Sequence, residues 1–313
     1  IRSVCIPSAS AGPPEATTLK MAMRCSAMRL PMNWRGSATD VFLTMNHSMH
    51  YLRQLAAGGA TDIHPGGEAA SVLLIEALDL CRGQVVLEIG CGPGATLVRI
   101  AAAYGVRAIG IDLLPEMLAI AARRVRWTGL DRQVTLVHGD AAALPIANGV
   151  CDRILSESVI GIQDQGRPEA MLAEIHRALK PGGRCVINEA IWRVTASDAE
   201  IDAANEQCMS AFGLRQASES RWRADDWSRA MKRAGFTVLA QDPASAAVAR
   251  HRSPTIPGRA VLASRALSLL QRADTALRRS ARQRKKAYRA LLDRHSGIGR
   301  LVESRLFVLE RPR

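Results

Sequence analysis

The sequence predicts an α/β fold built on a mostly parallel sheet. Short runs of branched apolar residues recur between residues 85 and 192, and segments with helical apolar spacing separate them. The runs end in glycines or acidic residues in the same phase. Because alternating strands and helices produce parallel strands, we expect a ligand site outside the carboxyl ends of these strands.

The first expected strand, within residues 85–89, ends in the run Gly90-Cys91-Gly92-Pro93-Gly94. The small and apolar residues at 95–103 then have the spacing of a helix. A glycine turn between a strand and a helix brings bare backbone N–H groups and a helix N-terminus to a ligand. The spacing is G-x-G-x-G, which differs from the G-x-G-x-x-G of dinucleotide-binding folds.

Three further strands are expected at residues 108–111, 134–138 and 153–155. The first ends in Asp112, the second leads through Gly139 to Asp140, and the third is bracketed by Asp152 and Glu157. Acidic side chains at several strand ends would converge on one crevice.

Helices are expected between these strands, at residues 115–126 and 168–179. The sequence Lys180-Pro181-Gly182-Gly183 is expected to stop the second of them.

These motifs together resemble a class I S-adenosylmethionine-dependent methyltransferase. The small-molecule type, similar to the ubiquinone/menaquinone and sarcosine/dimethylglycine methyltransferases, is the subgroup that they resemble. The resemblance runs from about residue 62 to 192 and more weakly to the C-terminus. It rests on the following segments, in this order: Glu88 to Gly94, Asp112, Gly139-Asp140-Ala141, Leu144-Pro145 and Leu179 to Gly183. It implies a Rossmann-like, mostly parallel seven-stranded sheet flanked by helices.

The resemblance also implies S-adenosylmethionine as cofactor and S-adenosylhomocysteine as product. Asp112 would accept hydrogen bonds from the ribose diol, Asp140 and the Ala141 amide would contact the adenine, and Glu88 would face the methionine amino group. The remaining implied cofactor residues are Gly90, Cys91, Gly92, Gly94, Leu113, Met117 and Ser156. Simpler roles stay open, namely solvated loop acids at Asp112 and Asp140, an incidentally paired acid at Glu88, and a packing residue at Cys91.

Three residues are candidates for catalysis. Glu157 and Glu189 follow the fourth and fifth strands, where related enzymes bind the methyl acceptor, although both could equally be helix or turn caps. His64 lies in a loop with Pro65 and two glycines before an expected helix, and could act as a general base. A loop and helix cap without a ligand role would have the same sequence pattern.

The expected reaction is metal-independent, in-line methyl transfer to a small-molecule nitrogen, oxygen or carbon nucleophile. Two alternatives stay open. One is C-methylation of a prenylated quinone or lipid at a membrane surface, and the other is a cofactor-binding partner subunit without catalysis.

The composition of the chain disfavours several other classes of function. The seven cysteines are scattered, with no C-x-x-C pair or His/Cys cluster, which favours reduced thiols in the cytoplasm and predicts no metal site. No run of about eighteen apolar residues is present, so no membrane span is predicted. Aromatic residues make up only 4% of the chain, which disfavours nucleic-acid binding.

The two ends of the chain differ from the middle. Residues 1–32 have the composition of a transit peptide, but several methionines could be start sites, so we expect a disordered or non-native extension. We expect the methyltransferase domain to span residues 33–313, with a cofactor-binding core at 62–192 and a substrate-side, C-terminal helical part at 193–313. An N-terminal helical segment is expected at about residues 34–57.

The formal net charge of +13 comes entirely from the C-terminal segment. From Pro243 onward there are 17 Arg and Lys residues against four acidic ones. Apolar residues at helical spacing between Leu262 and Leu291 predict a basic helical insertion before a last strand at 305–310. The insertion is expected to tune substrate access and not to hold the cofactor. A solvated basic face, attraction of an anionic substrate, peripheral membrane contact and nucleic-acid binding stay open as explanations of the charge.

Overall fold

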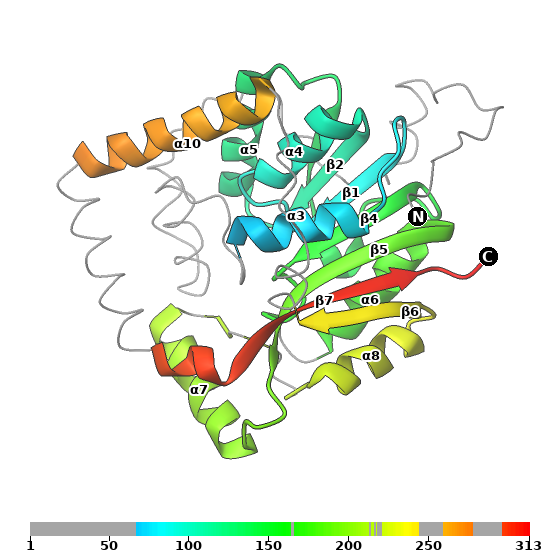
Figure 1. Cartoon of the computed structure of the whole chain (residues 1–313), viewed down its shortest axis with the longest axis vertical. Helices are drawn as coiled ribbons and strands as arrows, with labels where there is room; N and C mark the ends of the chain where they lie inside the picture. Colours follow the sequence, from blue (N-terminus) through cyan, green and yellow to red (C-terminus); the bar gives the residue numbers. More distant parts are fainter. Residues whose placement is uncertain are drawn as a thin grey trace.

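A seven-stranded sheet forms the centre of the protein in the computed structural model (Figure 1). The structure describes residues 67–163, 166–212, 214–215, 217, 221–243, 259–277 and 296–313. The strands are β1 (Val85–Ile89), β2 (Arg107–Asp112), β3 (Val134–His138), β4 (Cys151–Glu157), β5 (Leu179–Trp192), β6 (Thr237–Pro243) and β7 (Val302–Glu310). The helices are α3 (Gly67–Ala77), α4 (Ala95–Tyr104), α5 (Pro115–Thr128), α6 (Arg167–Ala178), α7 (Asp198–Phe212), α8 (Ala224–Arg233) and α10 (Arg259–Leu277), with the short 3-10 helices η2 (Ala141–Ala143) and η3 (Ser296–Arg300).

The strand order is β3-β2-β1-β4-β5-β7-β6. The first five strands pair in parallel, and β7 lies antiparallel between β5 and β6. This confirms the predicted Rossmann-like, mostly parallel seven-stranded sheet flanked by helices. The order reverses beside β1, which leaves a crevice at the carboxyl ends of β1, β2 and β4.

Alternate residues of the central strands pack into two different layers of helices. Leu87 and Ile109 belong to a core that includes side chains of α6 and α8, among them the fully buried Trp227. Val86 and Leu155 face the other way and pack with side chains of α3 and α4. Because side chains alternate along a strand, a strand buried on both faces must be apolar throughout, as β1 is apart from Glu88.

One predicted boundary was wrong, because Asp152 and Glu157 lie inside β4 and do not bracket it. Helix α6 ends at Ala178, just before Lys180 to Gly183 as expected, and these four residues belong to the start of β5. Cys151 pairs with Leu179 at the start of the β4–β5 ladder. The ladder continues with Arg153 and Arg184, so residues 180–183 bulge out of it. Gly182 N donates to Arg311 O and Gly183 O accepts from Arg311 N, which satisfies their backbone groups.

Several expectations concern residues outside the described part of the chain. They are the extension at 1–32, the helical segment at about 34–57, His64, and the most basic stretch of the insertion, from residue 278 to 289. Of the predicted insertion the structure describes α10, which lies against α4 and α5 (Figure 1).

Among the described residues, Cys91, Cys151, Cys185 and Cys208 are buried free thiols. Cys81 takes part in a disulfide, so the expectation of reduced cysteines does not hold for every one of them. No helix in the described residues is long and apolar enough to cross a membrane. The same residues contain no group of three His, Cys, Asp or Glu side chains arranged to hold a metal ion.

The C-terminal tail caps α6. Arg311 follows β7, and its Nη1 donates hydrogen bonds to the carbonyl oxygens of His176, Arg177 and Leu179, at 3.0, 3.2 and 2.6 Å. The last carbonyls of a helix have no partners within the helix, and a cation there also interacts favourably with the helix dipole. The tail therefore ties the end of the sheet to the helix that lines the pocket described below.

A carboxylate on β5 holds the loop that follows β4. Glu189 is 1% exposed and accepts hydrogen bonds from the backbone N–H groups of Val159, Ile160 and Gly161, at 3.0, 2.9 and 3.1 Å. Burial raises the pKa of Glu189 to about 7, although these three N–H groups oppose the rise. The same loop forms part of the pocket wall.

We predict that Arg311→Gln lowers the free energy of unfolding by about 1–2 kcal/mol, because three helix-end carbonyls lose their donor. Urea denaturation measures this change. Arg313→Gln is the matched control, because Arg313 is exposed. Equal stability of the two variants would contradict the capping role.

We predict that Glu189 makes stability depend on pH. The pKa of Glu189 is about 7 in the folded protein against an ordinary value of 4.5, so the folded state binds the proton more tightly. The wild type should therefore lose stability relative to Glu189→Gln as the pH rises from about 4.5 to 7, by at most about 3 kcal/mol. Urea denaturation of both proteins across this range measures the difference. Parallel stability curves would show that Glu189 does not titrate in this window.

Candidate functional site

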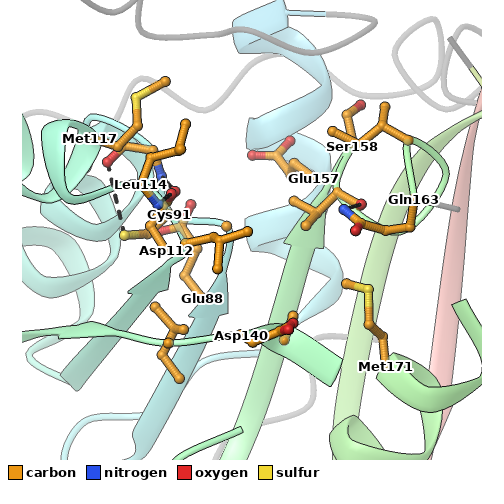
Figure 2. A pocket seen from close by; sticks show the side chains of 18 of the residues that line it. Glu88, Cys91, Asp112, Leu114, Met117, Asp140, Glu157, Ser158, Gln163 and Met171 are labelled. Carbon is orange, nitrogen blue, oxygen red and sulfur yellow. Dashed lines mark hydrogen bonds between the residues drawn. The ribbon is translucent and has the colours of Figure 1, made fainter. Parts of the chain in front are cut away.

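A pocket opens at the carboxyl ends of β1, β2 and β4 (Figure 2). Asp112, Leu114 and Met117 form one wall, while Glu157 and Gln163 stand on the opposite one. The pocket therefore lies at the sheet edge where the sequence predicted a crevice. Its chemistry depends on which acids reach it and how each is held.

The glycine loop after β1 contributes backbone to the pocket wall. Gly90, Gly92 and Gly94 have φ values of 64, 50 and 76°, a left-handed region that glycine adopts without strain. Gly92 lines the pocket, and a Cβ added to it would meet no atom within 4 Å. A Cβ on Gly94 would lie 2.9 Å from Ala121 Cβ of α5. One side of the loop is thus open to a ligand, and the other is packed on α5.

Asp112 joins this loop to the loop after β2. Its Oδ2 accepts from Gly92 N and its Oδ1 from Leu114 N, both at 2.8 Å. Burial raises the pKa of Asp112 to about 6, and the two N–H groups counteract part of that effect. Each carboxylate oxygen has a second lone pair, so Asp112 can also accept two hydroxyl donors from a ligand such as a sugar diol.

Glu88 has one buried carboxylate oxygen without a hydrogen-bond partner. This oxygen is Oε2, and the residue as a whole is 5% exposed. Burial raises the pKa of Glu88 well above its ordinary value, and the charges of Glu157 and Asp112 raise it further. The charge of Arg99 and the backbone N–H of Leu97 offset only part of this rise. A buried polar atom without a partner costs free energy, and a ligand that brings a cationic N–H donor would remove that cost.

Glu157 at the end of β4 is held from two helices. Ser71 Oγ of α3 lies 3.2 and 3.0 Å from its two carboxylate oxygens, and Thr96 Oγ1 of α4 lies 3.5 Å from Oε2. Two hydroxyl groups thus orient a half-buried carboxylate at the pocket wall. In this position the carboxylate can accept a proton from a bound ligand or contact a cationic group.

Asp140 forms the lower edge of the pocket in the view of Figure 2. Its Oδ1 accepts from Ala142 N at 2.9 Å and pairs with Arg167 Nη2 at 2.7 Å. Burial raises the pKa of Asp140, but the hydrogen bonds and the charge of Arg167 together hold it below its ordinary value. Asp140 is therefore ionised at neutral pH and can accept a further hydrogen bond.

The structure brings most of the expected residues together. Nine of the eleven expected cofactor residues line the pocket, namely Glu88, Gly90, Cys91, Gly92, Asp112, Leu113, Met117, Asp140 and Ala141. Gly94 packs behind the loop, and Ser156 is fully buried in β4 beside Ile89. Glu157 lines the pocket, whereas Glu189 lies behind it and holds the loop at 159–161.

Cys91 behaves as a packing residue in this arrangement. It is 4% exposed, and its Sγ lies close to Gly110 of β2, where an added Cβ would be 2.8 Å away. Burial, followed by the charges of Asp112 and Glu88, raises the pKa of the Cys91 thiol well above its ordinary value. The nucleophilic thiolate is thus disfavoured.

Sequence reasoning missed part of the wall. Gln163, Arg167 and Met171 reach the pocket from the loop after β4 and from α6, and Thr96 reaches it from α4. Arg167 stands before a proline at the start of a predicted helix, but its ion pair with Asp140 spans 27 residues. Only the packing of α6 beside η2 reveals that contact.

Comparison with known proteins identifies the fold and the family. A family model described as a methyltransferase domain matches residues 86–183. An uncharacterized methyltransferase, YdaC, of Bacillus subtilis is 33% identical over 147 residues, which are 46% of this chain and 73% of that protein. Methyltransferase GfsG of Streptomyces halstedii is 30% identical over 174 residues, 55% of this chain and 60% of that protein. The chain spans 39 to 60% of the length of the first three curated relatives that it matches.

A solved structure has the same fold. Phosphoethanolamine N-methyltransferase 2 of Haemonchus contortus, in complex with S-adenosyl-L-methionine, superposes with a TM-score of 0.62 at 19% identity. The superposition covers 87% of this chain and 61% of that one. The methyltransferase domain, the match to YdaC over 73% of its length at 33% identity, and this fold agree. The chain belongs to the class I S-adenosylmethionine-dependent methyltransferases.

Proposed function

We propose that this protein binds S-adenosylmethionine in the described pocket and transfers its methyl group to a small-molecule nitrogen, oxygen or carbon nucleophile. The observation that supports this most strongly is the buried Oε2 of Glu88, which has no partner and lies in a pocket also lined by Asp112 and Glu157. Three acids around one pocket favour a cationic ligand. When bound, the cofactor supplies an activated methyl group on a positively charged sulfur.

The residues of the cofactor side have distinct tasks in this proposal. Glu88 accepts a hydrogen bond from the amino group of the ligand, and its raised pKa falls when that cation is present. Asp112 accepts the two ribose hydroxyls while it keeps its bonds to Gly92 and Leu114. Asp140 and the Ala141 amide face the adenine, and Leu113 and Met117 provide apolar contact.

The acceptor side is assigned to the wall around Glu157. Its carboxylate, held by Ser71 and Thr96, takes up the proton of the nucleophile or contacts a cationic substrate. Ser158 and Gln163 lie beside it and offer hydrogen-bonding groups for orientation (Figure 2). Alignment of the nucleophile and exclusion of water then supply most of the rate, without a metal ion.

We predict that Asp112→Asn weakens binding of S-adenosylhomocysteine by about tenfold to a hundredfold. The amide removes the negative charge and one of the two acceptor oxygens, so that either Gly92 N or Leu114 N also loses its acceptor. Isothermal titration calorimetry measures the affinity. Wild-type affinity should also fall as the pH falls through about 6, where Asp112 takes up a proton, and this dependence should be reduced in the variant.

Glu169→Gln is the control for that experiment, since Glu169 is an exposed acid of α6 that does not line the pocket. Unchanged affinity in Asp112→Asn would remove Asp112 from the ribose role. Failure of the wild type to bind either S-adenosylmethionine or S-adenosylhomocysteine would refute the proposed function as a whole.

We predict that Glu157→Gln lowers kcat/KM for methyl transfer by about a hundredfold and leaves the affinity for S-adenosylhomocysteine within about threefold. The amide keeps an acceptor for Ser71 but cannot take a proton. The assay measures transfer of a labelled methyl group to a panel of amines, phenols and quinones, and then repeats the best acceptor with the variant. A variant as active as the wild type would show that Glu157 has no part in the transfer step.

A further inference from the structure

One buried guanidinium joins the glycine loop to the helix of the C-terminal insertion. Arg124 of α5 is 1% exposed, and its Nε donates to the carbonyl oxygen of Pro93 at 2.9 Å. Its Nη1 donates to Ser264 O, Ser264 Oγ and Ser268 Oγ of α10, at 2.9, 2.8 and 3.0 Å. Residues that are 31 and 144 positions away in sequence thus meet at one side chain.

The contact with Pro93 lies directly behind the ligand-facing part of the loop. Pro93 and Gly92 line the pocket, and Gly92 N donates to Asp112. Ala121, one turn before Arg124 on the same helix, packs against Gly94. Helix α5 therefore holds the loop at two adjacent points, and a shift of the Pro93 carbonyl would move the peptide that contacts Asp112.

The serines of α10 supply the acceptors for Nη1 of this guanidinium. Ser264 and Ser268 are each 6% exposed, and their spacing of four residues places them on one helix face. A buried guanidinium is expensive unless its N–H groups have acceptors. Without α10, Arg124 would lose three acceptor contacts and would be driven to move toward solvent, away from Pro93.

A second contact attaches α10 to the opposite wall. Arg265, next to Ser264, pairs with Glu68 in the first turn of α3, and Glu68 also pairs with Arg99 of α4 at 3.1 Å. The next turn of α3 carries Ser71, which donates to Glu157. Helix α10 is thus connected to the glycine loop and to the helix that orients Glu157.

We infer that α10 supports the cofactor pocket, and that Arg124 is the positioning residue that transmits this support to the glycine loop. The inference rests on the proposed function. It revises the expectation that the insertion only tunes substrate access, for the described part of that insertion. Arg124 touches no ligand in this scheme, because it is not among the residues that line the pocket.

The test uses the full chain with the double variant Ser264→Ala/Ser268→Ala, which keeps the guanidinium but removes its two hydroxyl acceptors. Arg124→Met removes all of these hydrogen bonds, and Arg124→Lys keeps the positive charge but not the several N–H donors of the guanidinium. Arg123→Met, at an exposed position of the same helix, is the matched control. Calorimetry measures S-adenosylhomocysteine affinity, and amide hydrogen exchange measures protection of a peptide that covers residues 90–98.

We expect the double variant to bind about three- to tenfold more weakly and Arg124→Met at least about tenfold more weakly, with partial recovery in Arg124→Lys. Exchange should accelerate at residues 90–98 and stay unchanged in β7. Arg123→Met should match the wild type. A lower melting temperature with unchanged affinity and unchanged loop exchange would overturn the inference, because Arg124 would then be structural only.

Two further outcomes are decided by the same data. If Arg124→Met does not fold, the double serine variant decides the question by itself. If the wild type binds no S-adenosylhomocysteine, the proposed function fails, and loop exchange alone tests the coupling. Faster exchange in the double variant would then support it, and unchanged exchange would overturn it.

Discussion

The burial of several carboxyl groups in one pocket is the constraint on which the surrounding structure depends. Burial raises the pKa of Glu88, and the charges of Glu157 and Asp112 raise it further. Burial also raises the pKa of Asp112, to about 6. A folded protein tolerates such a group of acids only when backbone N–H groups, hydroxyls or a cation compensate them. Backbone N–H groups serve Asp112 and hydroxyl groups serve Glu157. Glu88 Oε2 has no hydrogen-bond partner, which is the reason for the cationic ligand that we propose.

The supporting structure is arranged to keep those partners in place. Asp112 links the loops that follow β1 and β2, so the same carboxylate orders the backbone and faces the pocket. Glu189 holds the loop after β4 from behind with three backbone hydrogen bonds. Arg124 reaches the glycine loop from the other side. Buried polar groups outside the pocket thus determine the positions of the backbone inside it.

Charge on the C-terminal segment has at least two uses in the described residues. Arg265 of α10 pairs with Glu68, and Arg311 caps the end of α6. Both are basic residues of the segment that contributes the whole formal net charge of +13. A solvated basic face does not describe them, because each makes a specific contact with a distant element. The most basic stretch, at 278–289, lies outside the described residues.

Local patterns in the sequence determined the order and nature of the core elements. Apolar runs of about five residues, helical spacing and glycine turns predicted β1, β2, β3, α4 and α5 closely, because these features act within a few residues. The sequence also predicted that the acids at the strand ends lie close together, because the carboxyl ends of parallel strands meet at one edge of a sheet. Resemblance to known methyltransferases then assigned them to a cofactor.

Tertiary structure alone decided which groups compensate those acids. Ser71 meets Glu157 across 86 positions, and Arg124 meets Ser268 across 144. It also made Glu189 a loop support and placed Lys180 to Gly183 in a strand. No local pattern encodes such contacts, because a hydrogen bond between distant residues forms only when packing brings both elements together. The sequence determined which chemical groups are available, and the fold determined which of them meet.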